Sequence, residues 1–141
     1  MEHTALIYTM VLMSAADNDM ADVELGIIGE MVRTLPAFKQ FDQELLPRVA
    51  EDCAELVGSD GGLDTVIKLV KQSLPGRLRE TAYALACDIA AADGKVSDEE
   101  SRLLEMLRDG LEIDRLVAAA IERGARAHFQ QVRSAERKDT R

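Results

Sequence analysis

The sequence has no tryptophan, and aromatic residues make up only 4% of its 141 positions. A core must therefore be built from Ala, Leu, Ile, Val and Met, which suits helices better than sheets. No segment shows the sustained alternation of a half-buried strand, and no Gly/Ser-rich linker marks a second domain. The sequence predicts one all-α domain, a bundle of about seven helices around a single core.

Cysteine and histidine are also scarce. Cys53 and Cys87 lie far apart in apolar surroundings, without the spacing of a zinc site. His3 and His128 stand near the two ends, where we expect them to face solvent, and neither neighbours a Ser or Cys nucleophile. The short GSDGG segment follows no strand, so it is a poor phosphate loop. These absences predict buried free thiols in a reducing compartment and a protein that is not an enzyme.

Long hydrophobic runs are absent as well. The apolar stretch ALIYTMVLMSAA, residues 5–16, is too short to span a bilayer, and no basic segment precedes it. Its apolar residues surround the helix, which predicts a central place in the core. We therefore expect a cytoplasmic protein without direct membrane insertion.

Positive charge is sparse except at the C-terminal end. The chain has a formal net charge of −9, of which residues 1–121 carry −12 and residues 122–141 carry +3. An acidic body repels nucleic acid and favours cations, basic proteins or plain solubility. We expect a domain over residues 1–132, no nucleic-acid binding, and a charged flexible tail over residues 133–141.

Apolar spacing and breaker residues place the helices along the chain. Pro36 should end the second helix, and the regular part of the third should begin at Pro47. Gly58 suits a left-handed C-terminal cap, Gly110 separates the last two helices, and Asp114 supports the start of the last. The expected helices cover residues 3–16, 21–35, 42–57, 63–74, 77–92, 98–109 and 113–132.

The first two helices resemble the fifth and sixth at an offset of 76 residues. This alignment sets Asp17 on Asp93 and Glu24 on Glu100. Each copy is a helix, a short turn and a second helix, so the sequence predicts an internally duplicated pair of helix–turn–helix units. Helices three and four would bridge the two pairs.

Capping explains part of this pattern. Ser97 and Glu100 have the spacing of a capping box, but the matching cap position in the first copy is Ala21, which cannot cap. Glu24 is nevertheless present, where it also suits the helix dipole. We expect Val96 to pin the second turn onto the core.

The aspartates point to a second interpretation. Asp17 and Asp93 follow helix C-termini, where a carboxylate is unfavourable unless it makes an Asx-turn or meets a cation. An oxygen shell of Asp17, Asp19 and Glu24, or of Asp93 and Glu100, would suit Ca²⁺, Mg²⁺ or Mn²⁺. Turn architecture and a cation site both remain open. An EF-hand is excluded, because its closing acid would fall on Ile28 or Leu104.

The doubled motif, AADGKVSDEESRLLEML with AADNDMADVEL upstream, resembles the TerB-like domain of bacterial tellurite-resistance proteins. The resemblance covers about residues 3–130. It implies an all-α, internally duplicated cytoplasmic domain linked to tellurite and other chemical stress. It also implies membrane-associated and calcium-binding protein partners and a metal site at the acidic turns. Asn18 replaces the glycine of the motif in the first copy.

Two functions follow from these observations. The first is a metal-binding or metal-responsive protein-interaction module of a stress response. The alternative is a metal-independent helical adaptor that docks a partner through its acidic face.

Overall fold

The computed structural model describes residues 1–16, 22–92 and 96–132, except for the side chains of residues 22–25. Within these residues the chain forms α-helices and two short 3₁₀ helices but no strands, which confirms the all-α prediction. The helices are α1 (Glu2–Ser14), α2 (Asp22–Thr34), η1 (Pro36–Phe38), η2 (Gln43–Leu45), α3 (Leu46–Val57), α4 (Gly62–Ser73), α5 (Gly76–Ala91), α6 (Asp98–Gly110) and α7 (Arg115–His128).

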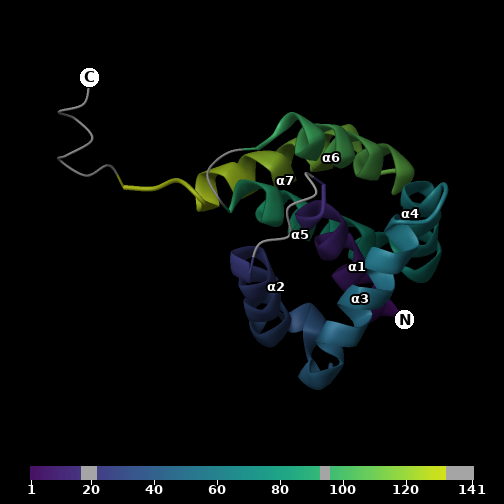
Figure 1. The fold of residues 1–141 in the computed structure, drawn as a ribbon. Coiled ribbons are helices and arrows are strands. Elements are labelled where there is room, and N and C mark those ends of the chain that lie inside the picture. The colour runs from purple at the N-terminus through teal and green to yellow at the C-terminus, as the bar shows by residue number, and fades with distance from the viewer. Residues whose placement is uncertain (17–21, 93–95, 133–141) are drawn as a thin grey trace.

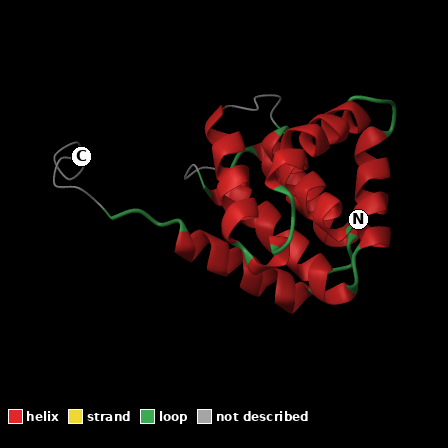
Figure 2. Cartoon of the chain, turned by 90° about the horizontal axis from the view of Figure 1, so that it is seen from below, coloured by secondary structure: helices red, strands yellow, loops and turns green. Residues whose placement is uncertain are grey.

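Helix α1 is the centre of the bundle (Figure 1). It packs against α2, α3, α4, α5 and α6, and its contact with α5 is the most extensive in the fold. Every residue from Ala5 to Ser14 is buried, as the apolar residues around this helix predicted. Figure 2 shows the same helices from below, wrapped around this core. Helices α3 and α4 both lie on α1, and α4 also reaches α6, so α4 contacts both of the predicted helix pairs.

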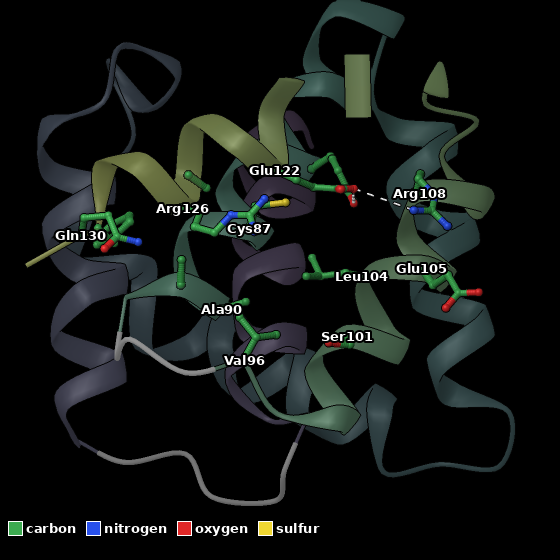
Figure 3. A pocket seen from close by; sticks show the side chains of 14 residues that line it. Cys87, Ala90, Val96, Ser101, Leu104, Glu105, Arg108, Glu122, Arg126 and Gln130 are labelled. Atoms are coloured by element: carbon green, nitrogen blue, oxygen red, sulfur yellow. Dashed lines mark hydrogen bonds and ion pairs between the residues drawn. The ribbon is translucent and has the colours of Figure 1, made fainter. Parts of the chain in front are cut away.

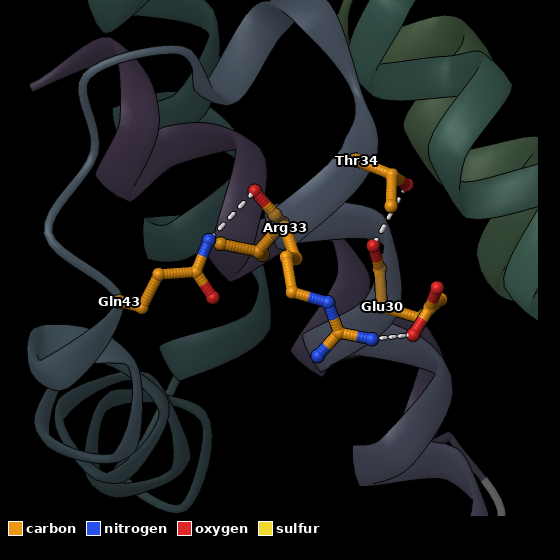
Figure 4. Close-up of polar contacts among 5 residues, drawn as sticks. Glu30, Arg33, Thr34 and Gln43 are labelled. Carbon is orange, nitrogen blue, oxygen red and sulfur yellow. Dashed lines mark hydrogen bonds and ion pairs between the residues drawn. The ribbon is translucent and has the colours of Figure 1, made fainter.

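The end of α2 is fixed by polar contacts that Figure 4 shows in detail. Thr34 Oγ1 donates to the carbonyl of Glu30 at 2.8 Å, and Arg33 pairs with Glu30. Gln43 Nε2, from η2, donates to the carbonyl of Val32 at 3.2 Å. Helix α2 ends at Thr34, two residues before Pro36, as predicted.

The α3–α4 corner corrects one prediction. Pro47 lies in the first turn of α3 as expected, but Gly58 has a right-handed φ of −74°. The left-handed residue is instead Gly61, with φ +66°, immediately before α4. A Cβ on the next residue, Gly62, would lie 1.8 Å from the carbonyl oxygen of Leu56, so only glycine fits this close approach.

The C-terminal helices differ from prediction at their ends. Gly110 does not separate α6 from α7; it is the last residue of α6, where an added Cβ would meet Ile67 Cγ2 at 2.5 Å. Asp114 caps α7 as predicted, because its Oδ2 accepts from the amides of Leu116 and Val117. Helix α7 ends at His128, earlier than residue 132. The predicted tail lies outside the described residues.

The thiols and histidines give a mixed outcome. Cys53 and Cys87 are free and buried, as predicted. His128 is exposed, but His3 is half-buried and packs against Phe38 and Phe41, with ring centroids 6.1 and 5.4 Å away. His3 was therefore wrongly expected in solvent. None of the described helices combines the length and apolarity that crossing a membrane requires.

Candidate functional site

The start of α6 is the best-defined part of the predicted site. Ser97 Oγ accepts from the amide of Glu100 at 3.1 Å, and Glu100 Oε1 accepts from the amide of Ser97 at 2.9 Å. This reciprocal pair is the predicted capping box. Glu100 is only 7% exposed, so its carboxylate is turned into the protein rather than toward bulk water.

The other predicted ligands are not placed. Asp17, Asp19 and Asp93 lie outside the described residues, and Glu24 belongs to α2 but its side chain is not described. In the described part of the chain, no group of three or more His, Cys, Asp or Glu residues is arranged to hold a metal. Because three of the five acids fall outside that part, the cation site stays a prediction.

The second turn does not meet the core through Val96. This side chain is 47% exposed, so the expectation that it pins the turn is wrong. Instead, Val96 lies on the wall of a cavity of about 510 Å³ that opens between α5, α6 and α7. This pocket was not predicted, because it depends on how α7 packs against α5 and α6. Figure 3 shows its lining.

One wall of this cavity carries a chain of polar contacts. Tyr83 Oη donates to Glu122 Oε2 at 2.6 Å, and Arg108 Nη1 lies 3.8 Å from the same oxygen. Burial raises the pKa of Tyr83, and its hydrogen bond to Glu122 raises it further. The phenol therefore stays a proton donor to Glu122 at neutral pH.

Helix α5 carries two further titratable side chains near Tyr83, namely Cys87 and Asp88. Cys87 lines the cavity, but burial raises the pKa of the thiol to about 12, so it is not an activated nucleophile. Asp88 is half-buried, and desolvation raises its pKa while His128 opposes the shift.

A second cavity, of about 420 Å³, lies between α1, α3, α4 and α6. Its walls are mostly apolar and include Leu12, Leu63, Leu103 and Met106. The described residues thus place one cavity beside the end of α1 and a more polar one beside the end of α5.

The comparisons with known proteins agree with the helical fold. A family model described as "Tellurite resistance protein TerB" matches residues 3–123, from α1 into α7. No curated protein and no solved structure matches the chain.

Proposed function

Because the chain belongs to the TerB family of tellurite resistance proteins, we propose that it is a metal-binding or metal-responsive module. In this proposal it docks protein partners during the response to tellurite and other chemical stress. It acts in the cytoplasm and is not an enzyme. Divalent Ca²⁺, Mg²⁺ or Mn²⁺ binds at the two acidic turns and stabilises each helix pair.

The burial of Glu100 is the observation that carries this proposal. A carboxylate that is only 7% exposed keeps its charge when hydrogen bonds or a cation replace the lost water. Asp93 precedes this helix by only a few residues, and Asp98 and Glu99 lie in its first turn. This concentration of negative charge at one turn supports cation binding.

The complete capping box favours the alternative, a metal-independent adaptor. The two hydrogen bonds between Ser97 and Glu100 give Glu100 a structural role that needs no cation. In this alternative the acidic body itself is the docking face. Its charge favours a basic partner segment.

A titration with cations separates the two functions. The full chain is titrated with Ca²⁺, Mg²⁺, Mn²⁺ and Zn²⁺ while the melting temperature and the calorimetric heat are followed. Binding to the folded state alone adds about 2.7 kcal/mol of stability at a cation concentration of 100 Kd. We expect one of the oxygen-preferring cations to raise Tm and to release or absorb heat.

Two variants with the same loss of charge identify the site. Asp17→Asn with Asp93→Asn should abolish the response, whereas Asp52→Asn with Asp60→Asn, both exposed, should leave it intact. If the first double variant responds as the unmodified chain does, the turns hold no cation. If the unmodified chain itself gives no response, the adaptor is the remaining function.

A further inference from the structure

The cavity between α5, α6 and α7 has the size and lining of a small-molecule site. At about 510 Å³ it falls within the range of ligand pockets in proteins, roughly 300–1,000 Å³. Ala90, Val96, Leu104 and Phe129 give it apolar surface. Val96, one of these lining residues, is 47% exposed.

Two arginines supply its positive charge. Among the residues that the structure describes, Arg108 makes two ion pairs, to Glu122 and Asp109, and both are at 3.8 Å, beyond hydrogen-bond distance. Arg126 has no hydrogen bond or ion pair to any residue that the structure describes. Figure 3 shows Arg126 and Arg108 on opposite sides of the cavity, with Glu122 between them and with Leu104 and Ala90 below.

The acidic residues of the cavity are less available. Glu122 already accepts the Tyr83 hydroxyl and faces Arg108. Glu105 is exposed, and Figure 3 shows its carboxylate pointing away from the other labelled side chains. The groups available to a ligand are therefore guanidinium donors beside apolar side chains. The rest of the protein is acidic.

We propose that this cavity binds a small amphipathic carboxylate. Its apolar body lies on Val96 and Leu104, and its head group accepts hydrogen bonds from Arg126. A carboxylate matches the planar donor fork of arginine, and the apolar floor excludes small hydrophilic anions. This site is separate from the cation site, so neither proposal depends on the other.

Three eight-carbon probes with different head groups test the charge preference. Octanoate, octanol and octylammonium are titrated at neutral pH, with a chelator present, into the ¹⁵N-labelled full chain. We expect octanoate to bind most tightly and octylammonium most weakly. The shifted amide resonances should be those of Ala90, Leu104, Phe129 and their neighbours.

Matched variants test the residues. Arg126→Gln should weaken octanoate about two- to fivefold, as expected for an exposed ion pair, and leave octanol unchanged. Arg123→Gln removes the same charge from the same helix outside the lining and should change neither. Ser101→Phe, at an exposed lining position on α6, should fill the cavity and weaken both probes.

Three results would overturn the proposal. Octylammonium or octanol binding as tightly as octanoate would remove the anion preference. Equal losses in the Arg123 and Arg126 variants would show a general charge effect instead of a site. The absence of localised resonance shifts with all three probes would show that the cavity takes no such ligand, and this measurement requires no variant to fold.

Discussion

The two helix pairs, α1–α2 and α5–α6, place their first helices in different surroundings. When the chain is aligned with itself at the 76-residue offset, Ile7, Val11 and Leu12 of α1 lie over Tyr83, Cys87 and Asp88 of α5. Helix α1 is covered by five other helices and is buried from Ala5 to Ser14. Helix α5 instead carries polar groups where it meets α7.

This difference shows that α1 and α5, which the 76-residue offset pairs, have different roles in the fold. The apolar α1 gives the fold its core, and the cavity beside its end is mostly apolar. The mixed face of α5 supports the Tyr83–Glu122–Arg108 contacts, and the cavity beside it has charged walls. Exchanging individual residues between the two pairs therefore tests what each contributes.

The largest effect is expected where α1 is converted to its α5 counterpart. Met10 is 0% exposed, and its aligned residue in α5 is Ala86. Met10→Ala should lower the free energy of unfolding by about 2–5 kcal/mol, because it leaves a cavity in the core. Urea unfolding measures the change. Met106→Ala, at a half-buried position on α6, is the control and should lower the free energy of unfolding by less. An equal loss in the two variants would contradict the central role of α1.

An intermediate effect is expected at the start of α6. Ser97→Ala gives this helix the residue of the first copy, Ala21, and removes the side-chain cap. The free energy of unfolding in the presence of a chelator should fall by about 1 kcal/mol. Glu100→Gln should cost less, because Gln can make the same reciprocal bond.

Ser101→Ala, an exposed change within the same helix, is the matched control for this cap. A cost confined to Glu100→Gln, with none for Ser97→Ala, would mean that Glu100 stabilises α6 through its charge rather than through capping. Cation titration of Glu100→Gln then reports on the charge alone.

The smallest effect is expected at Asp88, whose counterpart in α1 is Leu12. Desolvation raises the pKa of Asp88 in the folded chain, so the folded state holds the proton more tightly than the unfolded state. The resulting stability is present in acid and is lost as pH rises through the folded pKa. Asp88→Asn cannot ionise and should be slightly more stable than the unmodified chain at neutral pH.

Melting temperatures measured from acid to neutral pH check this sign. The difference in melting temperature between the two proteins should shrink as the pH falls. A stability gain that is the same at every pH would show that desolvation of the carboxylate is not its cause.

Local patterns in the sequence predicted most of the fold. The helices, the Asp114 and Ser97 caps and the burial of α1 depend on spacing within one element, which a single sequence displays. Gly61 was missed because several glycines of GSDGG could turn the chain, and only the packing of α3 on α4 selects one. The exposure of Val96 was also missed, because it depends on how α5, α6 and α7 pack around it.

The candidate sites divide along the same line. The capping role of Glu100 is local and was predicted, whereas the cavity between α5, α6 and α7 depends on contacts such as Tyr83–Glu122, which are distant in sequence. The sequence does indicate which of these side chains share a helix face, because residues four apart lie on the same side of a helix. Two such pairs are Tyr83 with Cys87 and Glu122 with Arg126. The internal duplication and the cation site remain predictions.

The complete enclosure of α1 has a consequence for the chain as it is synthesised. This helix leaves the ribosome before any of the five helices that cover it, and its most extensive partner, α5, begins only at Gly76. At translation rates of about 5–20 residues per second, the apolar surface of α1 that α5 covers stays exposed for several seconds. The nascent α1 is therefore a segment to which a molecular chaperone is expected to bind.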